Sequence, residues 1–291
     1  MGEGYRKFSR RSLFATTGLL GLAAAGATVS AGVNAAPGEV HRELKAVFGI
    51  DPAIRSERVY SAARGREVNI VTILPPGVPT EGLPMSLLLH GLHGNAHDAA
   101  VGGLAEVLAA GVATRLVRPF GFLAVDGGDN YWHPRQSDDP MGMLLDEAPQ
   151  WLAARGLGGP GGQPFACTGV SMGGFGALLY SRRRHERGRP TDATAAISPG
   201  LITNWPEMSK RNAFTSADEW AGLDPLRNID KLGPAPTGVW VGDGDKFIQG
   251  CRQFMSTAPL EIARVTPGGH TEEYWRTITP DVVGFLGRHV G

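Results

Sequence analysis

The chain has 291 residues, and its 28 basic and 28 acidic side chains give a formal net charge of zero. This balance provides no electrostatic footprint for binding a nucleic acid, and the presence of only two cysteines excludes a disulfide-rich scaffold. The length suits a single α/β domain with a large core, so we expect no second folded domain.

The N-terminal segment predicts an export signal. An uncharged stretch over residues 12–38 follows a short basic region, and residues 9–14 (SRRSLF) approximate a twin-arginine signal. An uncleaved membrane anchor is the alternative, because the uncharged stretch is long enough to span a bilayer. Its Gly, Thr and Ser content makes it only mildly apolar, which favours a cleaved signal. The basic residues are Arg6, Lys7, Arg10 and Arg11.

The small residues at 33–35 (VNA) offer a cleavage site, so residues 1–35 are predicted to be the signal and residues 36–291 the folded domain. The domain would carry 24 basic and 27 acidic side chains. We therefore expect an exported protein that is either secreted or associated with the cell envelope or the membrane surface.

Hydrophobic periodicity in the first half of this domain alternates between the strand and helix patterns. An alternating segment and a fully apolar run indicate two strands before the first long helix. The predicted elements are, in chain order, strand 66–74, strand 83–89, helix 99–116, strand 122–125, a polar and aromatic loop over 126–133, and helix 142–154.

Residues 169–173 (GVSMG) form a G-x-S-x-G pattern. In a chain with 42 glycines the bare pattern is weak evidence, but here an apolar stretch at 164–168 precedes it and a helix-forming stretch at 174–180 follows it. A serine on such a tight strand-to-helix turn has strained backbone angles, which small flanking residues permit. Ser171 is therefore predicted to be a nucleophile, rather than a serine that merely caps a helix.

The second half of the domain continues the alternation of strands and helices, which indicates a mainly parallel sheet. The segment over 199–236 is rich in Pro, Asn and Trp and weakly periodic, so we expect short helices that cover the carboxyl ends of the strands. The predicted regular elements are strand 193–198, strand 239–241, strand 261–265 and helix 279–290.

The partners of a nucleophilic serine are expected at the ends of later strands, the acid first and the histidine last. His270 follows two glycines just beyond the final predicted strand, which makes it the candidate base. Asp243 and Asp245 both follow strand 239–241, and either carboxylate could orient the imidazole. The Gly-x-x-Asp spacing favours Asp245, whereas Asp243 is typical of a turn residue that bonds its own backbone.

Ester chemistry also needs two backbone donors for the developing oxyanion. The residue after the serine, Met172, supplies the first, and Leu92, in the loop after strand 83–89, supplies the second. His90 is then a positioning residue. His93 and His97 have the spacing of metal ligands on a helix, but no third ligand is evident. No metal and no cofactor are predicted.

Four segments resemble a known family: residues 89–92 (LHGL), 169–177 (GVSMGGFGA), 242–247 (GDGDKF) and 268–275 (GGHTEEYW). They are similar to motifs of the esterases of the α/β-hydrolase superfamily that include esterase D, an S-formylglutathione hydrolase, and the secreted mycolyltransferase antigens. The resemblance implies the α/β-hydrolase fold, with a mainly parallel central sheet flanked by helices and a short cover segment, and a catalytic domain over 36–291.

The resemblance also implies that Ser171 is the nucleophile, Asp245 the acid and His270 the base. Leu92 and Met172 are the implied oxyanion donors. The loop that contains Tyr131 and Trp132 corresponds to a family segment near the acyl site, so these two residues, together with His90, are assigned to the substrate site.

The expected function is a secreted serine carboxylesterase that acts on a small-molecule or lipid ester through an acyl-enzyme intermediate. An acyltransferase that uses a sugar or glycerol hydroxyl is the first alternative. His90 stands where the mycolyltransferases have an acidic residue, which argues against transfer to trehalose. A non-catalytic relative that binds the cell envelope is the second alternative.

Overall fold

The computed structural model describes residues 51–291, and their central feature is an eight-stranded sheet. The predicted signal over residues 1–35 and the domain boundary at residue 36 lie outside the described residues. The strands are β1 Ala53–Ser61, β2 Arg66–Leu74, β3 Met85–Leu89, β4 Gly121–Val125, β5 Ala166–Val170, β6 Ala193–Ile197, β7 Thr237–Gly242 and β8 Ile262–Thr266.

The strands run in the order β1-β2-β4-β3-β5-β6-β7-β8 across the sheet. β1 and β2 form an antiparallel hairpin, and β2 pairs with β4 in the antiparallel sense. All the remaining pairs are parallel. The predicted mainly parallel sheet is therefore confirmed, and the carboxyl ends of β3 to β8 lie along one edge.

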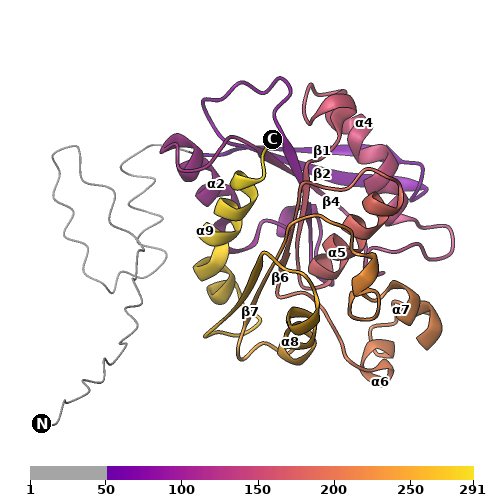
Figure 1. Ribbon diagram of the computed structural model, residues 1–291. Helices are drawn as coiled ribbons and strands as arrows, with labels where there is room; N and C mark the ends of the chain where they lie inside the picture. The colour runs from indigo at the N-terminus through magenta and orange to yellow at the C-terminus, as the bar shows by residue number, and fades with distance from the viewer. Residues whose placement is uncertain (1–50) are drawn as a thin grey trace, which may run out of the picture. The chain divides into compact units, whose positions relative to one another are not determined.

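Helices cover both faces of the sheet (Figure 1). α2 and α9 pack together on one face, and α4, α5 and α8 contribute to the core on the other face. Neighbouring residues of β3 divide between the two cores, because Leu87 and Leu89 face one and Leu88 faces the other. A strand buried on both faces explains the uninterrupted apolar run that the sequence shows there.

The longer helices are α2 Leu104–Ala113, α5 Met172–Glu186, α8 Ile248–Thr257 and α9 Glu272–Arg288. Shorter α-helices are α3 Pro140–Gly142, α4 Ala148–Ala153, α6 Trp205–Ser209 and α7 Ala217–Leu223, and a π-helical turn, η3 Met143–Glu147, joins α3 to α4. The short 3-10 helices are η1 Ala96–Asp98, η2 Val101–Gly103, η4 Pro160–Gly162, η5 Pro225–Arg227 and η6 Ile229–Lys231. The cover segment predicted over 199–236 thus consists of short helices.

Several element boundaries differ from the prediction for identifiable reasons. The helix predicted from residue 99 begins at Leu104, because Gly102 and Gly103 adopt positive φ angles of 62° and 71°. The C-terminal helix begins at Glu272, seven residues earlier than predicted, and Pro280 lies inside it. Its start is capped by the Thr271 side chain, which accepts a hydrogen bond from the Tyr274 backbone.

One strand, β1, and one of the longer helices, α8, were not predicted. β1 carries no strand signal in the sequence, because its side chains are mostly exposed and show no apolar alternation. α8 was also missed. It follows directly from the turn after β7 and buries only three of its ten residues, Gly250, Cys251 and Phe254.

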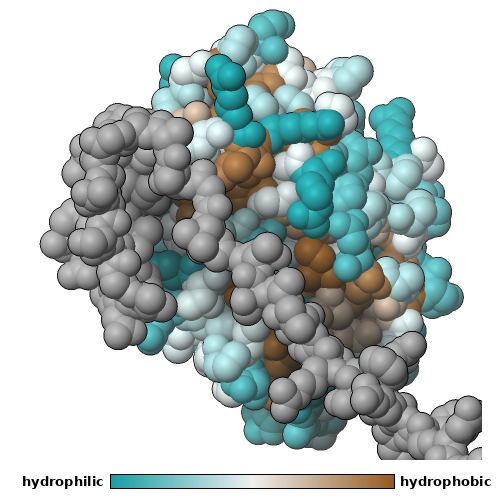
Figure 2. Space-filling model, turned by 60° about the vertical axis from the view of Figure 1, so that its left-hand side comes forward, coloured by the Kyte–Doolittle hydropathy of each residue, from teal (hydrophilic) through white to brown (hydrophobic). Residues whose placement is uncertain are grey.

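The face in Figure 2 is mostly hydrophilic, and its hydrophobic side chains are confined to small areas between polar ones. Within residues 51–291, no helix has the length and apolar character needed to cross a membrane. Cys167 and Cys251 are both buried and free.

Candidate active site

Ser171 occupies the turn between β5 and α5. Its backbone angles are φ 57° and ψ −118°, a region that residues other than glycine rarely adopt. Its N–H donates to the Ile197 carbonyl at the end of the neighbouring strand β6, at 2.9 Å. Its side chain is half-buried, and the hydroxyl makes no hydrogen bond with any residue of the described part of the chain.

The two glycines of the G-x-S-x-G pattern let backbone segments touch. A Cβ on Gly169 would collide with the Gly173 backbone, and a Cβ on Gly173 would collide with the Leu89 carbonyl at the end of β3. A side chain at position 173 would therefore push the turn away from β3, and one at position 169 would force the turn itself open. The close approach also brings the loop after β3 to the serine, since a Cβ on Gly91 would lie 3.4 Å from the Ser171 Cβ.

Asp245 and His270 form a hydrogen-bonded pair. The distance between Asp245 Oδ2 and His270 Nδ1 is 2.8 Å, and Asp245 Oδ1 accepts the Phe247 backbone N–H at 2.8 Å. Burial raises the pKa of the Asp245 carboxyl, but hydrogen bonds from His270, the Phe247 N–H and Ser198, with the nearby His270 charge, outweigh burial and lower it below its usual value. Asp245 is therefore a carboxylate at neutral pH.

Asp243 has a different role in the same turn. It is exposed, and its Oδ1 accepts the backbone N–H of Gly268 at 3.1 Å. The contact joins the turn after β7 to the loop that carries the histidine. Of the two candidate acids, Asp245 contacts His270, whereas Asp243 binds backbone.

Ser171, Asp245 and His270 follow the parallel strands β5, β7 and β8, so all three lie at the same edge of the sheet. Two aromatic rings hold the imidazole edge-on: Phe247 and Trp275, each with its ring centroid 5.2 Å from that of His270. With Nδ1 directed at the carboxylate, Nε2 is the nitrogen left to exchange a proton.

The backbone N–H groups of the two predicted oxyanion donors have no acceptor among residues 51–291. Met172 is the first residue of α5, so its N–H has no acceptor within the helix. The Leu92 N–H likewise donates to no residue of the described chain. The two N–H groups lie directly after Ser171 and directly after Gly91, the residue that approaches the serine.

His90 is buried and fixes the peptide that contains the Leu92 N–H. Its Nε2 accepts the Gly127 N–H at 2.9 Å, so its Nδ1 carries the proton and donates to the Gly91 carbonyl at 2.7 Å. The Gly91 carbonyl and the Leu92 N–H belong to one planar trans peptide and point in opposite directions. Burial lowers the pKa of His90, which keeps the ring neutral.

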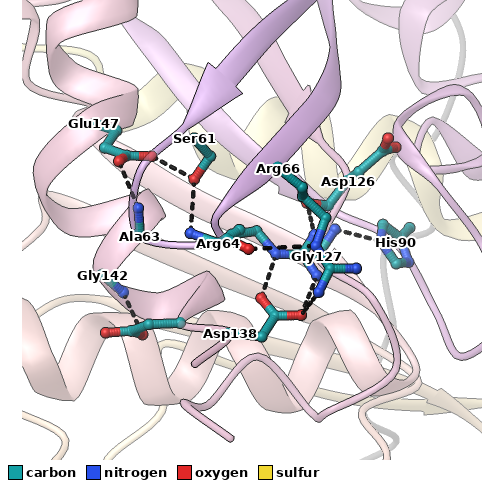
Figure 3. Close-up of polar contacts among 11 residues, drawn as sticks. Ser61, Ala63, Arg64, Arg66, His90, Asp126, Gly127, Asp138, Gly142 and Glu147 are labelled. Atoms are coloured by element: carbon teal, nitrogen blue, oxygen red, sulfur yellow. Dashed lines mark hydrogen bonds and ion pairs between the residues drawn. The ribbon is translucent and has the colours of Figure 1, made fainter. Parts of the chain in front are cut away.

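Arg64 holds the other end of this connection (Figure 3). Its Nη1 donates to the Asp126 carbonyl at 2.7 Å, and that carbonyl shares a peptide plane with the Gly127 N–H that binds His90. Asp138 accepts two hydrogen bonds from the Arg64 guanidinium, at 2.7 and 2.8 Å. The buried guanidinium thus connects to the Leu92 peptide through one peptide, Asp126–Gly127, and one imidazole, that of His90.

The structure corrects the assignment of His90 and Trp132 to substrate contact. Both side chains are fully buried, with ring centroids 5.0 Å apart. A Cβ on Gly176 of α5 would collide with the Trp132 ring, so the indole packs directly against the backbone of this helix. The sequence analysis assigns Trp132 to the substrate site because it lies in a polar and aromatic loop. Gly127 and Gly176 have no side chains, and the Trp132 ring occupies the space in the core that side chains there would fill.

Tyr131 is also buried, at 2% exposure, and its ring packs edge-on against Phe175 at 5.2 Å. Its hydroxyl makes no hydrogen bond within residues 51–291 and is not among their fully buried, unpaired atoms. The ring is therefore part of the core, while the hydroxyl reaches accessible space.

His93 and His97 have separate partners. His93 Nδ1 contacts Asp129 Oδ2 at 3.0 Å, and His97 Nε2 lies 3.3 Å from the Ser56 hydroxyl. The two residues do not share a helix, because His93 lies in a loop with a φ of 63° and precedes η1. Within residues 51–291, no cluster of three His, Cys, Asp or Glu side chains is arranged to hold a metal ion.

No protein-family model and no curated protein sequence matches the chain. Its structure is similar to that of a ferulic acid esterase, with a TM-score of 0.66 and 17% identity over 82% of this chain and 99% of the esterase. The chain has the α/β-hydrolase fold. The structure is also similar to an S-formylglutathione hydrolase from Agrobacterium tumefaciens, with a TM-score of 0.64 and 15% identity over 84% of this chain and 97% of that one.

A third similar structure is MPT51 of Mycobacterium tuberculosis, with a TM-score of 0.57 and 18% identity over 80% of this chain and 98% of that one. The similar structures therefore include both an S-formylglutathione hydrolase and a mycobacterial protein. At these identities the likeness establishes the α/β-hydrolase fold that the motifs predicted.

Several residues around the site escaped the sequence analysis. Arg64 and Asp138 lie 74 residues apart, and the β1–β2 hairpin that brings them together was itself not predicted. Ser198 was placed at the end of a strand, with no indication that its hydroxyl would accept the Trp275 indole N–H at 3.1 Å. Ser198 directly follows β6, and this position at the edge of the sheet is the sequence signal that connects it with the site.

The lowered pKa of His90 predicts that the stability of the folded protein depends on pH. In the folded chain its pKa is lowered, whereas the unfolded chain takes up a proton near the ordinary value of 6.5. The unfolded state thus binds more protons below that pH, so acidification lowers the free energy of unfolding by up to about 1.4 kcal/mol per pH unit, until the folded-state pKa is reached.

We expect the stability advantage of the wild type over His90→Gln to shrink between pH 7.5 and 5.5. Urea denaturation of both proteins at each pH measures it. An advantage that stays constant or grows on acidification would contradict a buried neutral His90.

Proposed function

We propose that the protein is a serine carboxylesterase that hydrolyses an acyl ester through an acyl-enzyme intermediate. One observation carries the proposal: the His270–Asp245 pair lies at the same sheet edge as a serine with strained backbone angles and an unbonded hydroxyl. An arrangement that serves only stability would be expected to satisfy the hydroxyl and relax the backbone. The likeness to esterases of the same fold supports the proposal.

In the first step, Ser171 Oγ attacks the ester carbonyl carbon while His270 Nε2 takes the hydroxyl proton. Asp245 stabilises the imidazolium, because its Oδ2 accepts the Nδ1 proton. The tetrahedral intermediate then expels the alcohol, which takes the proton from His270. Water attacks the acyl-enzyme by the same route, and the acid leaves as Ser171 regains its proton.

The developing oxyanion lies between the Leu92 and Met172 N–H groups in this mechanism. The connection from Arg64 to Leu92 consists of hydrogen bonds that all donate in one direction, from the Arg64 cation toward the position of the anion. Aligned hydrogen bonds polarise one another, so the Arg64 charge strengthens the Leu92 donor as well as fixing its direction. Arg64 and His90 are therefore positioning residues.

The proposed substrate is a small-molecule or lipid ester, and the proposed location is outside the cytoplasm. The location rests on the basic and uncharged regions of residues 1–38. The acyl-enzyme also permits transfer to an alcohol, and adding glycerol to an ester assay measures how much acyl group it captures.

The first test is the hydrolysis of p-nitrophenyl esters from acetate to palmitate by residues 36–291 and by Ser171→Ala. Removal of the nucleophile is expected to lower kcat by at least about 10⁴-fold, because the acyl-enzyme can no longer form. A wild type that retains the fold by circular dichroism but hydrolyses no ester would contradict the proposal.

The two neighbouring acids provide a matched pair for this assay. Asp245→Asn is expected to lower kcat by roughly 10³- to 10⁴-fold, because the histidine loses the partner that orients it and stabilises its charge. Asp243→Asn removes the same charge two residues away and is expected to retain kcat within a few fold. Equal losses in the two variants would argue against Asp245 as the acid.

Arg64 is tested through the separation of kcat from KM. Arg64→Gln is expected to lower kcat by roughly tenfold with KM within about twofold, because the oxyanion donor acts mainly in the transition state. Steady-state kinetics with the best p-nitrophenyl ester measures both constants.

Arg66→Gln is the control, since Arg66 also contacts Asp138, at 2.8 Å, yet makes no contact with Asp126. Thermal unfolding of both variants reports any general loss of structure. A kcat that falls equally in the two variants, or a KM that rises while kcat is retained, would exclude a role for Arg64 in the reaction.

A further inference from the structure

A pocket of about 450 Å³ opens beside the proposed oxyanion site. Its walls come from the loop after β3, the loop after β4 and the cover segment, with Leu92, Asp129 and Arg211 among the lining residues. Leu92, one of the two proposed oxyanion donors, is the lining residue that joins the pocket to the proposed site. The charged side chains around it are mostly cationic, which distinguishes this pocket from an apolar acyl-chain tunnel.

Most of these charges already have partners in the chain. The Asp129 carboxylate accepts the backbone N–H of His93 at 2.6 Å. Lys210 pairs with Glu207 at 2.6 Å, and the Arg135 guanidinium donates to the Asn212 carbonyl. These groups are neutralised or hydrogen-bonded before any ligand arrives.

Arg211 is the exception among them. Within residues 51–291 its guanidinium has no carboxylate partner and no hydrogen-bond acceptor, and its Nε is buried without a partner. Instead of a polar partner, the guanidinium has the aromatic ring of Phe247 beneath it, with the ring centroid 5.9 Å from the guanidinium carbon. A buried donor without an acceptor destabilises the folded protein, and a ligand that supplies the acceptor would remove this cost.

Arg211 also lies close to the proposed chemistry. Phe247, which it contacts, packs against the His270 ring. Arg211 therefore brings a cation without a polar partner among residues 51–291 to the wall of the pocket, one aromatic ring away from the proposed base.

We propose that this pocket recognises an ester that carries a second, anionic group, a carboxylate that pairs with the Arg211 guanidinium. The planar guanidinium matches a carboxylate in shape as well as in charge. The inference rests on the proposed esterase function and specifies its substrate class. The enzyme accordingly prefers the half-ester of a dicarboxylic acid, or an ester of a hydroxy acid, over a neutral ester of the same size.

Two matched pairs of esters test this preference on either side of the scissile bond. On the acyl side, p-nitrophenyl hydrogen adipate is compared with p-nitrophenyl methyl adipate. On the alcohol side, 4-acetoxybenzoate is compared with its methyl ester. The measured quantity is the ratio of kcat/KM for the anionic ester to kcat/KM for the neutral ester, in the wild type, Arg211→Gln and Lys210→Gln.

For at least one pair, the wild-type ratio is expected to exceed about 10, and Arg211→Gln is expected to lower it by about 10- to 100-fold, in line with a hydrogen bond to a charged group. Lys210→Gln removes an exposed charge from the same rim and is expected to leave the ratio within about threefold. Circular dichroism and thermal unfolding show whether Arg211→Gln retains the fold.

A ratio that Arg211→Gln leaves unchanged in both pairs overturns the inference. Equal losses in Arg211→Gln and Lys210→Gln also overturn it, because they indicate a general electrostatic effect. In either case, Ser171-dependent hydrolysis of the neutral esters would leave the proposed function intact, whereas an absence of hydrolysis with all four esters would contradict the proposed function itself.

Discussion

The contact between the Gly173 backbone and the Leu89 carbonyl is the constraint on which the proposed site depends. It presses the start of α5 against the end of β3, so the serine turn and the loop after β3 occupy one small volume. Ser171 adopts its strained backbone conformation within this contact, and Gly91 reaches the serine from the other side. The proposed nucleophile and the proposed oxyanion donors are therefore positioned by backbone packing, which is more rigid than contact between flexible side chains.

A second backbone contact positions the acid and the histidine. A Cβ on Gly242 would collide with the Gly268 carbonyl, and Gly268 has a φ of 147°. The turn after β7 thus packs directly on the loop after β8, which brings Asp245 within hydrogen-bond distance of His270. The polar connection from Arg64 extends the same rigidity to the Leu92 peptide, whereas the pocket around Arg211 retains a donor without a partner.

The sequence alone predicts much of this arrangement, because each essential feature is local. Strand β2 is delimited by its own alternation, and the glycines around Ser171 identify the turn within five residues. What escaped prediction depends on distant partners. The exposed strand β1 has no apolar period, yet its hairpin carries Arg64 to Asp126. Trp132 resembles a pocket residue until the glycines that admit its ring to the core are known.

The central claim is that Ser171 is the nucleophile, and covalent labelling tests it most directly. The protein is treated with a fluorophosphonate probe, and the modified residue is identified by mass spectrometry of its peptides. The account predicts one adduct, on Ser171, whose formation is greatly slowed in His270→Gln because the hydroxyl loses its general base. A folded protein that does not react, or that is labelled elsewhere, would contradict it.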